Sequence, residues 1–249
     1  KLAVDEGRFK ELMEQQRERA RSARKDKVLK EEADLIADLV NQGVKSEFTG
    51  YQTLEDESQV QVILAEGKKA DALSEGMAGE IVLVKTPFYG EAGGQVGDKG
   101  VIRGPEGEFE VWDTQKPGEG LIIHIGKVVQ GKIATGDRVA AIVDVDRRRR
   151  IMRHHTSTHL LQNALRGVVS PTIKQAGSMV APDRLRFDFN YFEAIPADKL
   201  ELVERRVNEL ILENIAVKTS TMPLKDVAGS GIIAFFDEKY GDTVRVLDV

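Results

Sequence analysis

The stretch VAAIVDVDRRRRIMRHHTSTHLLQNALRG, residues 139–167, contains a change in the spacing of apolar residues. Residues 139–143 form a short apolar run that is typical of a strand. Charged and helix-forming residues follow, and we expect Asp146 to cap a helix that Gly167 ends. The change predicts a boundary between two structural regions near residue 144.

Short strands are predicted before this boundary. From residue 46 to residue 144 the apolar residues recur with a period of two, and glycines separate the runs. Several short strands at this spacing favour a small glycine-rich β-barrel. The predicted strands cover residues 58–64, 81–84, 108–113, 121–125 and 139–143.

Residues 1–45 are predicted to form a helical linker segment. A narrow apolar stripe, Phe9, Leu12, Met13, Ala20 and Ala23, runs through a sequence that is otherwise charged or carries amides. A second helix is expected over residues 29–40.

Helices alternate with strands after residue 145. The strands are expected at residues 176–180, 185–189, 216–222 and 243–249, and an amphipathic helix begins near Pro196. This alternation predicts a separate α+β domain over residues 145–249, with a mixed or antiparallel sheet. The chain as a whole is therefore predicted to be α+β.

The composition excludes several classes of protein. The 249 residues are 41% hydrophobic and 31% charged, without a membrane-spanning apolar run or a signal-peptide pattern. No cysteine is present, so this chain has no disulfide or thiolate metal site, and we expect it to be cytoplasmic. The net charge of −5 argues against nucleic-acid binding through overall charge, although local basic clusters can still bind phosphate. A start at Lys1 and an end inside a strand-like run indicate a fragment.

Two histidines four residues apart, His155 and His159, are the strongest local signal. On a helix they share one face and can reach one metal ion. The alternative is that both are partly buried and hydrogen-bonded within the fold. A zinc metalloprotease is a poor fit, because its helix motif needs Glu where this chain has Thr156. His124 and His154 are the other histidines that a metal site could use.

Four consecutive arginines, residues 147–150, begin the predicted helix, and Arg153 follows one turn later. Such a run usually forms a solvated face. Because it lies on the helix that carries the histidine pair, Arg147, Arg150 and Arg153 are also candidates for contacts to the phosphates of a polyanion. The residues leave both interpretations open.

The segment TPFYGEAGGQVGD, residues 86–98, is rich in glycine. Gly93 and Gly94 permit positive φ and a close approach of the backbone to a ligand. A tight turn between barrel strands would also explain many of these glycines. A phosphate-binding loop is excluded, because no Gly-Lys-Ser or Gly-Lys-Thr follows.

The order of several segments resembles that of alanyl-tRNA synthetases and their free-standing editing relatives. The resemblance extends over nearly the whole chain, and its start is similar to the segment that joins the synthetase core to its editing region. The matching segments are residues 7–17, 86–98, 155–161, 174–178, 185–189, 237–242 and 244–246.

The resemblance implies a glycine-rich barrel and an editing core that hydrolyses serine or glycine from misacylated alanine tRNA. Residues matching the editing pocket are Thr158, Gln175 and Ser178, and Gly93 and Gly94 lie against it by analogy. The implied partner is the acceptor end of tRNA(Ala). The whole synthetase would ligate alanine to tRNA(Ala) with ATP, although nothing in this chain resembles an ATP site. The family's dimerising tail is absent here, so we expect a monomer.

Zn²⁺ is the cofactor that the resemblance implies. In the family, the histidines that match His155 and His159 bind zinc, and the other ligands come from a Cys-x-x-x-His motif beyond the strand that ends here at Val249. Because this chain has no cysteine and stops first, we expect zinc to be absent or weakly held, and hydrolysis could be lost.

The chemistry agrees with a second, hydrolytic site. An aminoacyl ester is activated, so its hydrolysis mainly requires an oriented water and a polarising centre. A pocket can exclude alanine if its polar groups, such as the Thr158 hydroxyl, need serine's hydroxyl as a partner. Two alternatives stay open. One is a non-catalytic tRNA-docking module with structural histidines, and the other is a free-standing deacylase that no ATP-binding core precedes.

Overall fold

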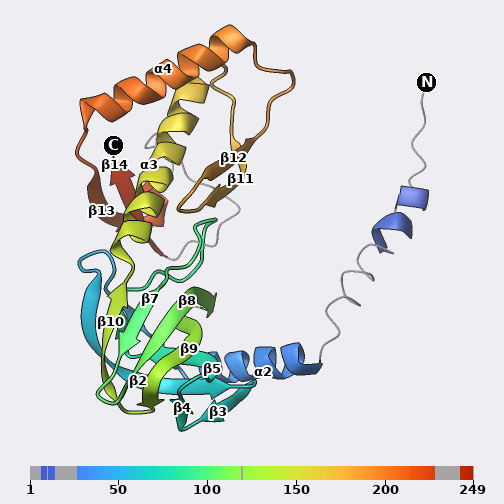
Figure 1. Cartoon of the computed structure of the whole chain (residues 1–249). Helices are drawn as coiled ribbons and strands as arrows, with labels where there is room; N and C mark the ends of the chain where they lie inside the picture. The colour runs from blue at the N-terminus through green and yellow to red at the C-terminus, as the bar shows by residue number, and fades with distance from the viewer. Residues whose placement is uncertain (1–6, 10, 15–26, 119, 228–241, 249) are drawn as a thin grey trace. The chain divides into compact units, whose positions relative to one another are not determined.

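The computed structural model in Figure 1 describes residues 7–9, 11–14, 27–118, 120–227 and 242–248. The chain divides into two compact units, one made of Lys1–Ala92 and Gly97–Arg148 and the other of Gly93–Val96 and Arg149–Val249. The segment Gly93–Val96 thus belongs to the second unit, although its neighbours on both sides belong to the first. The domain limits predicted from the sequence, 1–45, 46–144 and 145–249, stay predictions.

The helical lead-in is described in part. Residues 7–9 and 11–14 are helical, whereas Ala20 and Ala23 lie outside the described residues. Helix α2 (Lys27–Asn41) includes the helix predicted at 29–40. Its buried face carries Leu39, with Leu35 and Ile36 beside it, and packs against strand residues such as Val82 and Leu121. Burying this stripe is what holds α2 on the first unit.

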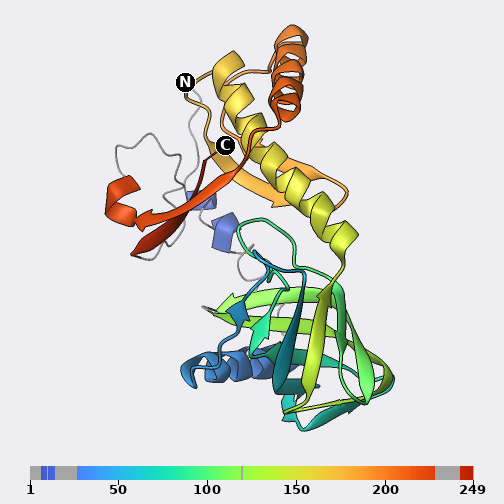
Figure 2. The same ribbon diagram turned by 90° about the vertical axis from the view of Figure 1, so that its left-hand side faces the viewer.

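The first unit contains the predicted barrel, which is confirmed. Strands β10, β7, β8, β9, β5 and β2 pair antiparallel in that order, and a further pairing between β10 and β2 closes the ring (Figures 1 and 2). The strands of this unit are β1 (Glu47–Phe48), β2 (Glu55–Ala65), β3 (Lys68–Ala70), β4 (Ala72–Ser74), β5 (Ala78–Leu83), β6 (Lys85–Thr86), β7 (Gly100–Arg103), β8 (Gly107–Gly118), β9 (Leu121–Ala134) and β10 (Arg138–Val143).

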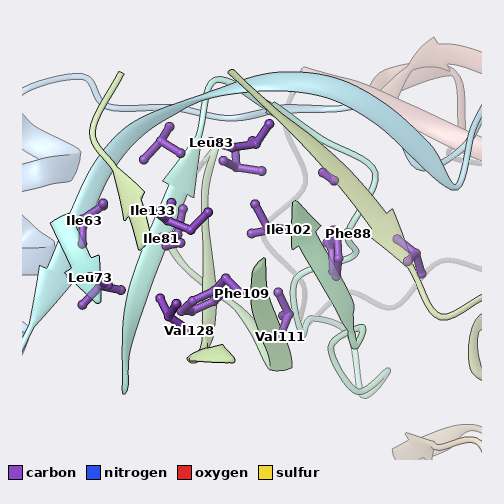
Figure 3. Close-up of a cluster of buried hydrophobic side chains, with 14 residues drawn as sticks. Ile63, Leu73, Ile81, Leu83, Phe88, Ile102, Phe109, Val111, Val128 and Ile133 are labelled. Carbon is purple, nitrogen blue, oxygen red and sulfur yellow. The ribbon is translucent and has the colours of Figure 1, made fainter. Parts of the chain in front are cut away.

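Apolar side chains fill the inside of the barrel (Figure 3). Phe88 and Phe109 are the largest of them and are fully buried. A ring of this size leaves an interior that side chains can occupy completely, so it is a packed core. Strands β8 and β9 continue beyond the predicted residues 113 and 125, because their backbones still pair where the apolar alternation has ended, as at Thr114 of β8 and Lys127 of β9.

Helix α3 (Val145–Val168) begins and ends differently from the prediction. Asp144, not Asp146, caps it, because Asp144 Oδ1 accepts the backbone N–H of Arg147 at 3.0 Å. Gly167 does not end the helix either, since α3 continues through Val168. Backbone N–H groups of Val169 and Ser170 donate to the carbonyl of Leu165 and close the last turn.

The rest of the second unit consists of hairpins and helix α4 (Ala197–Glu213). Pro196 occupies the N-cap position of α4. Val203 of α4 packs with Leu165 of α3 and with Ile173 in a small core. Two antiparallel pairs stand where the sequence predicted one sheet, β11 (Gln175–Val180) with β12 (Leu185–Phe189), and β13 (Lys218–Pro223) with β14 (Thr243–Asp248). Short helix α5 (Leu224–Val227) follows β13. No helix in the described part of the chain is both long and apolar enough to span a membrane.

Candidate functional site

The paired histidines lie on one face of α3, as their spacing predicted. The ring centroids of His155 and His159 are 5.3 Å apart and the rings are nearly parallel, with 27° between their planes. His155 is half-buried, and His159 keeps an exposed face. Two imidazoles stacked in this way can direct nitrogen atoms toward the same point outside the helix.

A buried amide contacts the first of these histidines. His155 Nδ1 lies 2.7 Å from Oε1 of Gln95, a residue that is only 6% exposed. Gln95 stands inside the glycine-rich segment that the sequence singled out, but no role was predicted for it. An amide directly after two glycines is the signal that could have drawn attention to it.

Two glycines allow the segment Gly93–Val96 to reach strand β11. Gly93 and Gly94 have φ of 57° and 79°, in the left-handed region that glycine adopts without strain. A Cβ on Gly94 would lie 2.5 Å from the Ser178 carbonyl oxygen and 2.8 Å from its Oγ. Only glycine therefore fits against the strand at this point.

Backbone hydrogen bonds hold the segment in place. The Gly94 carbonyl accepts the Val180 N–H at 2.8 Å, and the Val96 N–H donates to the Val180 carbonyl at 3.1 Å. These bonds form a parallel bridge between Gln95 and Val180. The segment therefore joins β11 through its backbone and α3 through the Gln95 side chain.

Two of the predicted pocket residues meet on β11. Gln175 Nε2 donates to Ser178 Oγ at 3.2 Å, and both side chains are half-buried. A β-bulge between Gln175 and Gly177 shifts the register of β11 against β12. The third residue, Thr158, is buried on α3, where its hydroxyl donates to the His154 carbonyl at 2.9 Å. That bond lies within one helix turn, so the hydroxyl is partly occupied by its own helix.

The two other histidines have structural partners. His154 Nδ1 lies 2.6 Å from the carbonyl oxygen of Ala181. His124 is fully buried in the barrel, where its ring nitrogens lie 2.8 Å from the Ile81 carbonyl and 2.8 Å from Thr86 Oγ1. Burial lowers the pKa of His124 to about 4, against the hydrogen bond to Ile81, which raises it. His124 is thus a neutral core residue.

The donor set of the histidine pair suits a metal ion in part. Removal from water lowers the pKa of His159, so this ring stays neutral at neutral pH and keeps a lone pair for an ion or a proton. A structural zinc site needs four ligands. Among the residues that the structure describes, no group of three or more side chains could hold a metal. The described residues therefore supply two donors at most.

The arginines of residues 147–150 differ in burial and in their partners. Arg148 is buried and forms an ion pair with Asp98, and its guanidinium also donates to the carbonyls of Gly50 and Pro87 at 3.0 and 2.7 Å. Arg147 donates to the Gly97 carbonyl at 2.8 Å.

The other arginines of the run, Arg149 and Arg150, are exposed on α3, as is Arg153 one turn later. Arg153 also lines a groove of about 390 Å³ between α3 and α4. Of the three arginines predicted to contact phosphate, Arg150 and Arg153 therefore present their charge to solvent, and Arg147 does so in part.

Comparison with known proteins finds relatives that match this chain over nearly its whole length. The chain is 46% identical over 248 residues to an alanine–tRNA ligase of Chloroflexus aurantiacus. The aligned region covers 100% of this chain and 27% of that protein. It is 44% identical to an alanine–tRNA ligase of Anaeromyxobacter sp. over 98% of this chain and 27% of that protein. It is 42% identical to the alanine–tRNA ligase of Carboxydothermus hydrogenoformans over 100% of this chain and 28% of that protein.

This chain therefore spans only 27–28% of the length of these relatives. A family model described as tRNA synthetases class II (A) matches residues 1–147. This match covers more than half of the chain, and the chain belongs to that family.

Proposed function

We propose that this chain is the editing part of an alanine–tRNA ligase, which hydrolyses serine or glycine from misacylated tRNA(Ala). One observation carries the proposal. The segment Gly93–Val96 joins the face of α3 that bears His155 to the strand that bears Gln175 and Ser178. Imidazoles, an amide and a hydroxyl thereby gather in one unit, and these are the groups that ester hydrolysis and recognition of a hydroxyl require.

Recognition of the misattached amino acid is assigned to Gln175 and Ser178. Their hydrogen bond leaves each with further capacity, because the amide retains its oxygen acceptor and the hydroxyl retains its own donor proton. Serine's hydroxyl can pair with these groups, whereas alanine would leave them without a partner. Such a pocket disfavours alanine through the cost of unpaired polar groups, which favours hydrolysis of the wrong product. Thr158 is the third residue proposed for this pocket. Because its hydroxyl already donates to the His154 carbonyl, we assign its side chain the role of limiting the space in the pocket.

Zn²⁺ is part of the proposal, with His155 and His159 as two of its ligands. When bound, it would polarise the ester carbonyl or an attacking water. The residues that the structure describes offer only these two ligands, and two ligands bind an ion weakly, so we expect this chain to hold zinc poorly. His155 and His159 would hold the ion from one face of α3.

Arg150 and Arg153 are proposed to bind phosphates of the tRNA acceptor end, with Arg147 as a third candidate. Their exposure on α3 supports this, because charges at the surface can meet a polyanion without losing internal partners. The binding would weaken steeply as salt is raised. Ligation of alanine with ATP, cytoplasmic residence with the translation machinery, and a monomeric state of the chain are proposals as well.

Deacylation of serine-charged tRNA(Ala) tests this function. The rate would be measured with this chain and with a chain extended by the adjoining part of an alanine–tRNA ligase, and zinc content would be determined on the same samples. We expect the extended chain to bind zinc and to hydrolyse, and this chain to be slower. Ser178→Ala in the extended chain should lower the rate at least about 10-fold, since an unpaired polar partner costs about 1–3 kcal/mol.

The control is Ser170→Ala, which removes an exposed hydroxyl that bonds to Thr172, two residues further along the chain. This variant should keep the rate. If neither chain hydrolyses nor holds metal while both bind tRNA, the non-catalytic docking module takes the place of the editing function.

A further inference from the structure

We infer that Gln95 is a positioning residue, which holds His155 in the tautomer that carries its proton on Nδ1 and keeps the lone pair on Nε2. Only the consequence of this tautomer for metal binding or proton transfer rests on the proposed function. The tautomer itself is a property of the chain without substrate or metal.

The backbone of Gln95 is held on both sides. The residue before it, Gly94, accepts the Val180 N–H with its carbonyl, and the residue after it, Val96, donates its N–H to the Val180 carbonyl of β11. The closeness of Gly94 to Ser178 prevents the segment from moving toward the strand. Gln95 therefore projects from a point fixed by β11, which is the condition for a side chain to orient another one.

The side chain of Gln95 is enclosed and makes a short contact. At 6% exposure it is shielded from water, and its Oε1 lies 2.7 Å from Nδ1 of His155. An amide oxygen can only accept a hydrogen bond, so the proton of this contact belongs to Nδ1. A buried polar group that finds a partner keeps it, because losing the hydrogen bond would cost about 1–3 kcal/mol.

The consequence lies at the other nitrogen. A neutral imidazole has one N–H and one lone pair, so a proton on Nδ1 leaves the lone pair on Nε2. Nε2 is then the nitrogen that can bind an ion or take a proton. Partners of this kind orient a histidine ligand, and their loss typically lowers metal affinity about 10- to 100-fold.

Two histidines in the same chain provide internal references. Nδ1 of His154 faces the Ala181 carbonyl, and Nδ1 of His124 faces the Ile81 carbonyl. A backbone carbonyl can only accept, so both rings carry the proton on Nδ1 whatever residue stands at position 95. Their nitrogen signals define the pattern that His155 is expected to match.

The test is a long-range proton–nitrogen correlation spectrum of the chain with ¹⁵N-labelled histidine, recorded at about pH 8, where imidazole is neutral. In the wild-type chain, His155 should show the same Nδ1–H pattern as His124 and His154. In Gln95→Leu this pattern should be lost for His155 alone, with exchange between the two tautomers. Gln95→Glu keeps an acceptor oxygen and should retain the Nδ1–H pattern.

The result that would overturn the inference is the Nε2–H pattern for His155 in the wild-type chain, which would mean that the amide of Gln95 donates. An unchanged His155 pattern in Gln95→Leu would overturn it too. Hydrogen-exchange protection of the Val180 amide shows whether each variant keeps the segment on β11, and the wild-type spectrum decides the tautomer even if a variant fails to fold.

The inference and the proposed function can fail separately. If the tautomer is found as expected and the extended chain does not hydrolyse serine-charged tRNA, Gln95 still positions His155 and the editing function is wrong. If hydrolysis occurs and Gln95→Leu leaves both tautomer and rate unchanged, the function stands without the role inferred for Gln95.

Discussion

Single residues of this chain differ most in what surrounds them. His124 and His159 are the same chemical group, yet one is enclosed by the barrel and the other keeps a face in water. For both, removal from water lowers the pKa, and for His124 it does so to about 4. The environment of each histidine therefore determines its pKa and its role, and the residue type alone does not.

The buried His124 should make the barrel unit sensitive to acid. An unfolded chain protonates this ring near its ordinary pKa of 6.5, whereas the folded chain does so only near pH 4. Stability is therefore fully present above pH 6.5 and is lost as the pH falls toward 4, by on the order of 3 kcal/mol.

Urea unfolding followed by Trp112 fluorescence at several pH values would measure this effect, with His124→Gln as the reference that removes the titrating ring. The advantage of the wild-type chain over this variant should shrink toward pH 4. A difference that does not change with pH would show that His124 is not the group responsible.

The ion pair of Asp98 with Arg148 should be costly to break on one side only. Asp98 is fully buried and Arg148 is 5% exposed, so either charge alone would be left without compensation. Asp98→Ala should lower the free energy of unfolding by about 3–5 kcal/mol. The exposed neighbour Arg149 is the control, and Arg149→Ala should change stability by no more than about 0.5 kcal/mol. Equal effects of the two substitutions would contradict the buried role of the pair.

At the scale of elements, the segment Gly93–Val96 and strand β11 depend on close approach. Gly94 and Gly76 have nearly the same φ, 79° and 81°, but a Cβ on Gly76 would meet nothing within 4 Å. Both substitutions to Ala carry the cost of the left-handed backbone, about 1–2 kcal/mol. Only Gly94→Ala adds a collision with Ser178.

Gly94→Ala should therefore detach the segment from β11, whereas Gly76→Ala should not. Hydrogen exchange of the Val180 amide, whose partner is the Gly94 carbonyl, would measure the detachment directly. We expect protection of this amide to fall in Gly94→Ala and to stay in Gly76→Ala. Unchanged protection in both variants would mean that the strand can move to accommodate a methyl group.

At the scale of the whole molecule, the two units differ in the size of their cores. The barrel encloses a large cluster of fully buried side chains, whereas the described residues of the second unit form a smaller core and leave Phe192 and Leu212 86% and 84% exposed. Less apolar area removed from water means less stabilisation. The second unit should therefore unfold first.

Two spectroscopic signals can separate these transitions. Trp112 is the single tryptophan and lies in the barrel unit, so its fluorescence reports that unit alone. Circular dichroism in the far ultraviolet is dominated by helix and includes α3 and α4. With rising urea, the circular dichroism should begin to change before the fluorescence. Coincident curves would indicate one cooperative unit instead.

The sequence by itself determined the kind of elements and their order. Period-two alternation with glycines predicted the barrel, and the spacing of His155 and His159 predicted one helical face, because both features depend only on local geometry. Element ends were predicted less well. Backbone pairing, and not apolar alternation, sets how far β8 and β9 extend, and Asp144 caps α3 because it stands one residue before the first turn.

The tertiary structure alone decided which residues meet. Three features depend on contacts between residues far apart in sequence. The segment Gly93–Val96 pairs with β11, and Gln95 contacts His155. Arg148 is buried, whereas Arg150 on the same helix is exposed. No local periodicity encodes such contacts, because they arise only when separate elements pack and each buried polar group must find a partner.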